Sequence, residues 1–418
     1  MANDLSKAVA YIDDHRDDLI KLMQTMIRTK SVNPALDPTS EGEGKMAQLM
    51  IEELTDLGLT VETLEAVKGR PNIVARLKGS KPGPRILFNA HLDTVNGKVE
   101  DGWVAGPFSG DIVDGFIYGR GACDHKSPLA EMLYALKALR AIGHEFAGEL
   151  IIVCDVDEEE GGIQGMRKIA EHFDLSSDYA LYGCTTDFFP EAKSFYSAVG
   201  DHNIIRALSG RLQMVLKVKG QSWHTLTPKL DKNAFVEAMK IMPELQAYIE
   251  ETNAFEDPIC GTGHQRMTLS TCECGPRQSR PAEWCNIYIA RRVDGTEKLE
   301  DVEADIKARI TAMLKKHGVD GVVETIRGVP NIVVDEKLPL IQELAKAAEE
   351  ITGERPKVTG WPASVGISQL LAAKSIPSVL FAYGVINMHH AVNERLAVEN
   401  LIRTAKVYCL AFGRLLSA

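Results

Sequence analysis

An acidic cluster directly follows an apolar segment rich in β-branched residues. The segment Ile151–Cys154 has the composition of a buried strand, and the cluster after it contains Asp157, Glu158, Glu159 and Glu160. Neighbouring carboxylates repel one another and resist desolvation. A strand that carries them to its C-terminal end therefore needs a cation, a substrate or open water to receive them. The cluster indicates either a binding site or a solvated acidic turn.

Other imidazole and carboxylate side chains follow further predicted strands and a glycine turn, at positions far apart in the sequence. They are His91 and Asp93 after Arg85–Ala90, Asp124 after Gly119–Gly121, and His389 and His390 after Pro377–Ala382. Imidazole and carboxylate ligands together suit zinc or another divalent transition ion, and a carboxylate beside such an ion provides a general base for activating water. Because ligands bind outside the carboxyl ends of strands in open α/β sheets, we expect these residues to form one site.

The elements that must position these residues alternate between helices and strands. Helices are predicted at residues 4–28, Gly42–Leu57, Pro128–Ile142, Leu338–Thr352 and Val398–Leu415 from their apolar spacing. Strands are predicted at Thr60–Leu64, Asn72–Leu77, Arg85–Ala90, Ile151–Cys154 and Pro377–Ala382. The pattern predicts an α/β domain with a mixed central β-sheet flanked by helices.

The character of the sequence changes near residue 205. The predicted order there is strand, helix, two strands, helix and strand, over Leu212–Val218, Asn233–Glu250, Arg266–Cys272, Asn286–Arg292, Leu299–Lys316 and Gly321–Ile326. This β-α-β-β-α-β order is typical of a ferredoxin-like domain. We therefore expect a discontinuous catalytic domain over residues 1–204 and 328–418, with an inserted domain over residues 205–327.

Composition limits the function classes. The chain has 418 residues, of which 45% are hydrophobic and 25% charged, as is ordinary for a globular protein. Its net charge of −11 disfavours nucleic acid as a partner, because phosphate binding needs a basic surface. The sequence has no apolar run of the roughly 20 residues needed to span a bilayer and no leader-like N-terminus, so we expect a cytoplasmic protein without membrane contact. Eight cysteines are too few for a disulfide scaffold in a chain of this length.

Four motifs together resemble one known family. They are His91–Val95, Gly119–Lys126, Asp157–Gly162 and Gly220–Pro228. In these segments the sequence resembles the co-catalytic zinc amidohydrolases and peptidases that include aminoacylase, glutamate carboxypeptidase, acetylornithine deacetylase, succinyl-diaminopimelate desuccinylase and tripeptidase T. The resemblance covers nearly the whole chain. It implies hydrolysis of a carbon–nitrogen bond and an inserted domain that acts as a lid and joins subunits into a homodimer or higher homo-oligomer.

The resemblance also implies metal ligands. His91 would hold one ion, with Asp93 orienting its imidazole, and Asp124 would bridge two ions. Glu159 would hold the other ion, together with His390. His390 keeps the family spacing His-x-x-Asn-Glu, whereas the neighbouring His389 does not.

Further residues match the family's catalytic and substrate-binding positions. Glu158 would be the general base that takes a proton from water and passes it to the leaving nitrogen. His224, from the lid and often from the partner subunit in this family, would stabilise the oxyanion. Arg292 matches a lid arginine that binds a substrate carboxylate through a bidentate fork.

Two departures from the family pattern affect the metal and the substrate. Cys184 stands where relatives carry a glutamate or aspartate ligand, and either its thiolate or Asp187 is a candidate substitute. The sequence therefore predicts one or two zinc or manganese ions per chain. Family members commonly carry a glycine-rich turn that contains threonine and aspartate, and this chain has Gly360–Ser364 at that place. The difference indicates unusual substrate recognition.

Aromatic residues near the expected site are either core residues or the walls of a ring-binding pocket. They are Trp361, Tyr383, Phe188 and Phe189. We predict a metal-dependent hydrolase that cleaves a C–N bond, amide or amine, of a small carboxylate-bearing substrate. The first alternative is an aromatic aminohydrolase of the 5-nitroanthranilate type with a single labile metal. The second is a metal-binding pseudo-enzyme, against which the retained Glu158 argues. A nucleotide-dependent oxidoreductase is remote, because the glycines lack the GxGxxG context.

Overall fold

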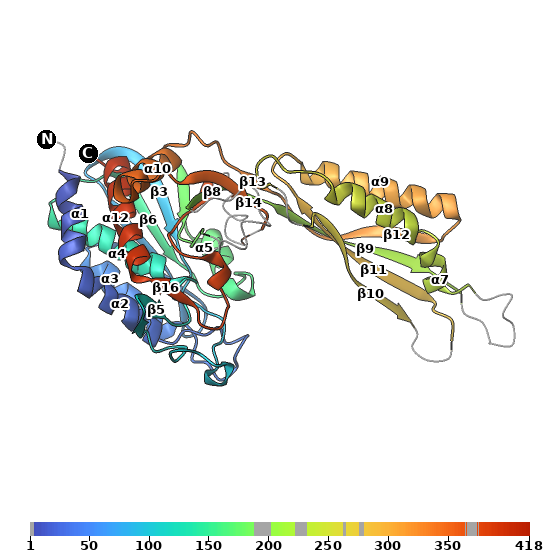
Figure 1. The fold of residues 1–418 in the computed structure, drawn as a ribbon, viewed down its shortest axis with the longest axis horizontal. Helices are drawn as coiled ribbons and strands as arrows, with labels where there is room; N and C mark the ends of the chain where they lie inside the picture. The colour runs from blue at the N-terminus through green and yellow to red at the C-terminus, as the bar shows by residue number, and fades with distance from the viewer. Residues whose placement is uncertain are drawn as a thin grey trace.

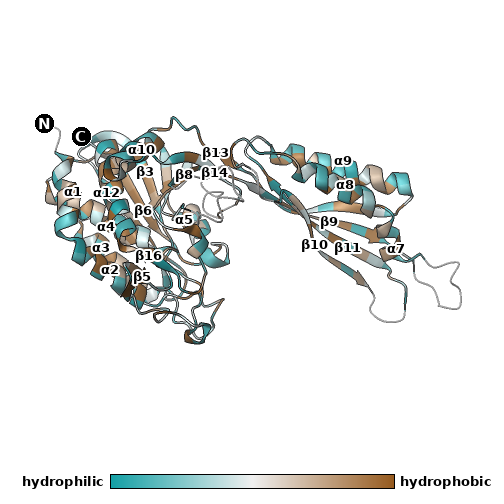
Figure 2. Cartoon of the chain, viewed as in Figure 1, coloured by the Kyte–Doolittle hydropathy of each residue, from teal (hydrophilic) through white to brown (hydrophobic). Residues whose placement is uncertain are grey.

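The computed structural model describes residues 4–187, 202–221, 232–261, 265–275, 280–363, 365, 374 and 376–418 of the chain. Two sheets organise these residues, and each sheet has its own hydrophobic core (Figure 1). Figure 2 shows that the strands of the larger sheet are mainly hydrophobic. The expected α/β architecture, a large mixed sheet flanked by helices, is confirmed.

The larger sheet has nine strands. Its order is β1 (Thr60–Val67), β2 (Arg70–Lys78), β6 (Ala147–Cys154), β3 (Lys81–Asn89), β7 (Tyr179–Tyr182), β15 (Ser378–Leu380), β8 (Asn203–Leu208) and β13 (Ile332–Val333), and β14 (Lys357–Trp361) also pairs with β8. The neighbours β6, β3, β7 and β15 run parallel to one another. Their carboxyl ends therefore meet at one edge of the sheet, where the chain presents polar side chains.

Seven helices accompany this sheet in the described residues. They are α1 (Leu5–Asp14), α2 (Arg16–Arg28), α3 (Gly44–Asp56), α4 (Lys126–Ala141), α5 (Met166–His172), α10 (Pro339–Thr352) and α12 (Val398–Leu415). The helix α4 packs against α1, α2 and α12, and nearly all of its residues are buried. The single helix predicted over residues 4–28 is wrong: two helices meet at His15, whose ring Nδ1 lies 2.9 Å from the Tyr11 carbonyl oxygen and whose backbone leaves the helical region.

Short elements connect the loops at the carboxyl edge. The strands β4 (Ile112–Val113), β5 (Phe116–Tyr118) and β16 (Arg395–Ala397) form a three-stranded sheet. The short 3-10 helices η1 (Val99–Asp101), η2 (Glu158–Glu160) and η3 (Ile386–Met388) lie in the loops. This three-stranded sheet joins the segment before Asp124 to the segment after His390, because β5 pairs with β16.

The four-stranded sheet belongs to the inserted domain, to the right in Figure 1. Its elements along the chain are β9 (Gly210–Lys219), α7 (Ala234–Met239), α8 (Met242–Asn253), β10 (Met267–Gly275), β11 (Trp284–Val293), α9 (Leu299–His317) and β12 (Gly321–Val329). The strands pair antiparallel in the order β10-β11-β9-β12. One helix was predicted over Asn233–Glu250, but Pro243 fits only the first turn of a helix and so begins a second one.

The core of the inserted domain lies between its sheet and its helices. The helix α9 contributes Val302, Ile306, Ile310 and Leu314, spaced to line one face. Burying each such side chain stabilises the fold by about 1.5–3 kcal/mol. The strand β8 pairs with β13 and β14 of the larger sheet, and the next strand, β9, belongs to the sheet of the inserted domain. No helix in the described ranges is long and apolar enough to cross a membrane.

Candidate metal centre

Four parallel strands deliver the polar residues of the candidate site. His91 follows β3, the glutamates of η2 follow β6, Cys184 follows β7, and His389 and His390 follow β15 through η3. The register brings Asn89 of β3 opposite both Val153 of β6 and Tyr182 of β7, and Leu380 of β15 opposite Tyr182. The strand ends are therefore level, and side chains that lie up to 300 residues apart in sequence meet at the edge.

Asp124 lies at the centre of this cluster and is buried. Its Oδ1 is 3.2 Å from His91 Nε2 and 3.1 Å from His125 Nε2. Its Oδ2 is 3.1 Å from His390 Nε2 and 3.4 Å from His389 Nδ1. Burial opposes ionisation of Asp124, but the surrounding imidazoles outweigh it and hold the pKa of this carboxyl well below its usual range. Each oxygen of an ionised Asp124 thus faces a separate pair of nitrogen ligands, as a carboxylate bridging two ions would.

The two adjacent glutamates of η2 point to different neighbours. The Oε2 of Glu159 lies 2.9 Å from His390 Nε2, and its Oε1 is buried without a hydrogen-bond partner among the described residues. The Oε2 of Glu158 lies 3.9 Å from His91 Nε2. Burial raises the pKa of Glu158 to about 8. Glu158 thus lies at the edge of the ligand cluster, whereas Glu159 lies within it.

Asp93 anchors both the imidazole and the glutamates. Its carboxylate accepts hydrogen bonds from the backbone N–H groups of Glu158 and Glu159, each at 3.1 Å, and from the Asn33 side chain at 2.8 Å. The Nδ1 of His91 lies 3.0 Å from the backbone carbonyl oxygen of Asp93. A proton on Nδ1 satisfies that carbonyl and leaves the Nε2 lone pair facing Asp124, which is the tautomer that binds a metal.

A buried ion pair that the sequence analysis did not identify connects the loops. Arg120 donates to Glu394 at 2.7 Å, and the other oxygen of Glu394 accepts from the backbone N–H groups of Cys123 at 2.8 Å and Asp124 at 3.0 Å. Arg120 also donates to the carbonyl of His390 at 3.4 Å. The pair fixes the Asp124 loop against the His390 loop. Both residues lie inside motifs of the sequence, but their pairing depends on the fold.

The cluster fits a divalent metal ion. Three groups place one ligand atom of each member within 4.8 Å of the others: Asp124, Glu159 and His390; His91, Asp124 and His125; and His125, Cys184 and His389. Two buried atoms, Glu159 Oε1 and His125 Nδ1, have no hydrogen-bond partner in the described part of the chain. Imidazole, carboxylate and thiol ligands suit zinc, and imidazole and carboxylate ligands also suit manganese.

The thiol of Cys184 lies with the cluster, whereas Asp187 lies elsewhere. Cys184 groups with His125 and His389. Asp187 accepts a hydrogen bond from the backbone N–H of Gly384 at 3.0 Å and lies 3.5 Å from His202 Nδ1. No ligand group found in the described residues contains Asp187.

Two histidines of the cluster were not in the ligand set that the family resemblance implies. His389 was named among the metal-type side chains but lies outside the family spacing, and His125 was quoted only as part of a motif. His389 Nε2 also contacts the Thr185 hydroxyl at 2.7 Å. The spacing of residues in a sequence does not tell which way adjacent side chains point in a loop, so only the structure brings these two to Asp124.

A cavity of about 320 Å³ opens over the cluster. Asp124, Glu158 and Glu159 line one side, and the other walls come from Tyr182, Trp361, Val365 and Ile386. Its lining thus combines charged groups with an apolar, partly aromatic surface, as small-molecule sites do.

The remaining predicted residues lie apart from this cavity or outside the described chain. Tyr383 is buried, and its ring packs edge-on against Phe381 and His202. Arg292 lies on β11 of the inserted domain and is not part of the described cavity lining. His224, Phe188 and Phe189 fall outside the described residues.

A mixed sheet with His, Asp and Glu collected at its parallel strand ends, and with a separate inserted domain, defines a metallohydrolase-type architecture. Comparison with known proteins identifies the family. Residues 87–414 match peptidase family M20/M25/M40, and the chain belongs to that family. This confirms the resemblance stated from the motifs and makes the protein a hydrolase acting on C–N bonds, of a family whose members depend on metal ions.

Curated relatives span nearly the whole chain. The N-formyl-4-amino-5-aminomethyl-2-methylpyrimidine deformylase of Halalkalibacterium halodurans is 24% identical over 430 residues, covering 96% of this chain and 95% of the relative. The succinyl-diaminopimelate desuccinylase of Azoarcus sp. (strain BH72) is 27% identical over 385 residues, covering 89% of this chain and 92% of the relative.

Solved structures share the fold. A putative aminohydrolase from methicillin resistant Staphylococcus aureus superposes with a TM-score of 0.72 at 17% identity, covering 99% of this chain and 100% of that one. The Bacillus subtilis YXEP protein, described as a dinuclear metal binding peptidase, has a TM-score of 0.68 at 15% identity, covering 97% and 99%.

Proposed function

We propose that the chain hydrolyses a C–N bond of a small carboxylate-bearing substrate in the cavity above Asp124, with Glu158 as the general base. Asp124, Glu159 and His390 would hold one divalent ion, and His91 with Asp124 would contribute to a second. When bound, such ions polarise the scissile group and lower the pKa of water. The function of each carboxylate follows from its neighbours: Glu159 contacts His390, and Glu158 faces the cavity.

The protein groups carry out the proton transfers and the positioning. Glu158 accepts a proton from the attacking water and donates it to the leaving nitrogen, so the leaving group departs as a neutral amine. Asp93 holds the N–H groups of both glutamates, which keeps the base at a fixed distance from the ligand cluster. Tyr182, Trp361 and Ile386 exclude water from one side of the substrate.

One observation carries this proposal. Glu158 lines the cavity and belongs to none of the three ligand groups around Asp124 and Cys184, while its neighbour Glu159 belongs to one. A protein that only bound a metal would have no need of a half-buried free carboxylate beside the ligands.

A substrate screen tests the proposal. The purified protein, loaded with zinc or manganese, is offered N-acyl amino acids, N-formyl amines, dipeptides, ureido acids and aminobenzoates, and release of amine or ammonia is followed. We expect turnover of one class that the Glu158→Gln variant lacks. Equal turnover by the variant contradicts the proposed base, and silence of every class with both metals contradicts the substrate range.

The aromatic wall supports aromatic amines as a second substrate class. Trp361 and Tyr182 both line the cavity, next to the ligand cluster. If an aminobenzoate is the substrate, Trp361→Ala raises KM for it more than it raises KM for an aliphatic N-acyl amino acid. Arg292 and a homo-oligomer joined through the inserted domain remain predictions. Arg292→Lys is tested by KM for substrates with and without a carboxylate, and the assembly by sedimentation equilibrium.

A further inference from the structure

The inserted domain contains a group of three cysteines far from the catalytic cavity in sequence. Cys272 and Cys274 are two residues apart on β10, so their side chains share one face of the strand. Cys285 on β11 is the register partner of Cys274. The Sγ atoms are 3.6 Å apart for Cys272 and Cys285, 3.9 Å apart for Cys272 and Cys274, and 2.9 Å apart for Cys274 and Cys285. We call these three residues the thiol triad.

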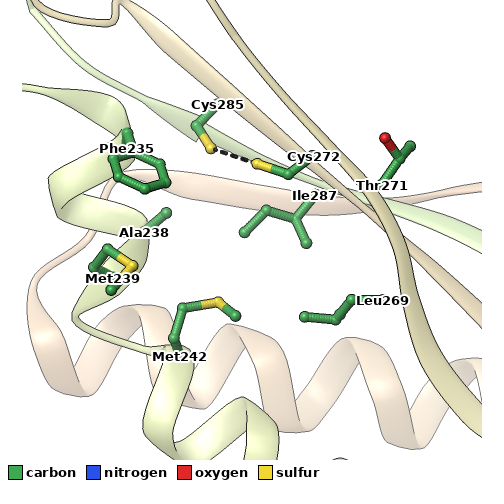
Figure 3. A pocket seen from close by; sticks show the side chains of 9 residues that line it. All are labelled: Phe235, Ala238, Met239, Met242, Leu269, Thr271, Cys272, Cys285 and Ile287. Atoms are coloured by element: carbon green, nitrogen blue, oxygen red, sulfur yellow. Dashed lines mark hydrogen bonds between the residues drawn. The ribbon is translucent and has the colours of Figure 1, made fainter.

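The triad borders an apolar pocket that contains further sulfur atoms. The pocket has a volume of about 300 Å³, and its lining includes Cys272, Cys285, Met239 and Met242 (Figure 3). Phe235, Leu269 and Ile287 complete much of its wall. No histidine or carboxylate belongs to this lining or to the triad in the described part of the chain.

Accessibility and burial are divided among the three thiols. Cys272 is exposed, Cys274 is half-buried and Cys285 is buried. A small ion can therefore reach the triad from solvent at Cys272, while Cys285 fixes it to the core of the domain. Burial raises the pKa of the Cys285 thiol, so this thiol is protonated at neutral pH in the metal-free chain.

We propose that the thiol triad is a binding site for Cu(I). Soft thiolate and thioether ligands select Cu(I), and a group of three sulfurs without nitrogen or oxygen ligands matches this preference. Metal–sulfur bonds of about 2.3 Å place sulfurs roughly 3.8–4.0 Å apart around one ion. The Cys272–Cys274 separation of 3.9 Å has this size, and the Cys272–Cys285 separation of 3.6 Å is slightly shorter. The Cys274–Cys285 pair, at 2.9 Å, opens by about 1 Å through side-chain rotation.

Binding requires no oxidant or reductant. Each thiol that coordinates Cu(I) releases its proton to solvent and forms one Cu–S bond, so the copper stays monovalent and the sulfurs stay reduced. The competing chemistry is a disulfide between Cys274 and Cys285, which face each other on neighbouring strands. That reaction removes two electrons and leaves Cys272 as a single thiol, so it cannot coexist with the three-sulfur site.

The test uses full-length protein whose catalytic centre is already loaded with zinc, reduced and kept free of oxygen. Cu(I) is titrated against a chromophoric Cu(I) chelator, and copper–thiolate absorption in the ultraviolet reports the ligand type. We expect the wild-type chain to bind one more equivalent of Cu(I) than the Cys272→Ser variant at the same chelator concentration. Any Cu(I) held by the two remaining thiols of the variant should be bound at least 100-fold more weakly than Cu(I) at the intact triad. Cys272 is exposed, so this variant should fold normally. Cys409→Ser, at an isolated buried cysteine of α12, is the matched control and should bind like the wild type.

Three outcomes overturn the proposal. The first is equal copper uptake by the wild-type chain and Cys272→Ser. The second is a Cys274–Cys285 disulfide that persists in the reduced protein, detected by thiol counting and peptide mass. The third is that Zn(II) bound to the triad is not displaced by added Cu(I), which would assign the triad to a structural zinc site. The proposal is supported if the Cys285→Ser and Cys272→Ser single variants both fail to bind copper while substrate turnover stays unchanged in each.

Discussion

The Glu158→Gln substitution tests the division of roles between the two glutamates. Glutamine keeps the shape of the side chain but cannot accept a proton at the carboxylate. The backbone N–H of residue 158 still donates to Asp93, and Glu159 still contacts His390, so the ligand cluster stays in place. Positioned general bases contribute about 10²–10⁴ in rate, and we expect kcat to fall by that factor, or by about 3–5 kcal/mol in activation free energy.

The assay combines kcat on the substrate found in the screen with metal content measured by mass spectrometry after dialysis. Glu159→Gln is the matched control: it changes the neighbouring carboxylate in the same way, and we expect it to lose metal and to recover activity as metal is added. Glu158→Gln should keep its metal and stay inactive at every metal concentration. A Glu158→Gln variant within tenfold of wild-type kcat, or one that loses metal in parallel with activity, would refute the reasoning.

Three further outcomes follow from the loops. Glu394→Gln leaves Arg120 buried without its ion-pair partner and should lower the free energy of unfolding by about 3 kcal/mol in urea denaturation; an unchanged value would contradict the role of the pair. Cys184→Ser should weaken zinc binding more than manganese binding in competition dialysis, because only zinc prefers sulfur, and equal weakening would place the thiol outside the centre. Hydrogen bonds to Asp124 and Glu159 raise the pKa of His390 to about 10 in the metal-free chain. The His390 imidazole must therefore lose a proton before it can bind a metal. Metal affinity should therefore rise with pH by about tenfold per unit near neutrality, and the slope should shrink in His390→Ala.

Much of the fold follows from local patterns. The β-branched segment at Ile151–Cys154 and the strands before His91 and His389 are short apolar runs whose length and composition favour buried strands. The structure confirms the mixed sheet, and the parallel run β6-β3-β7-β15 explains why residues of one chemical type follow separate strands. Boundaries were less predictable. The break at His15 depends on one side-chain contact with the preceding turn, and β8 looks like any apolar segment until its pairing with β14 is known.

The candidate site was predictable where a residue type is tied to the end of a strand. His91, Glu159 and His390 were expected near Asp124, and all three lie near it in the structure. The family spacing selected His390 over His389, and it could not show that the His389 side chain also turns toward Asp124 in its loop. Contacts between residues far apart in sequence were not predictable either. The Arg120–Glu394 pair joins residues 274 positions apart, and neither side chain by itself indicates the other.

That pair joins segments that are synthesised far apart in time. His91, Asp124 and Glu159 leave the ribosome long before His390 and Glu394, so the nascent chain carries part of the cluster without the residue that holds the Asp124 loop in place. If the cluster binds a metal as proposed, we expect high-affinity binding only after the segment that follows β15 has been translated. A product truncated before η3 would lack His390 and Glu394 and should not assemble the centre.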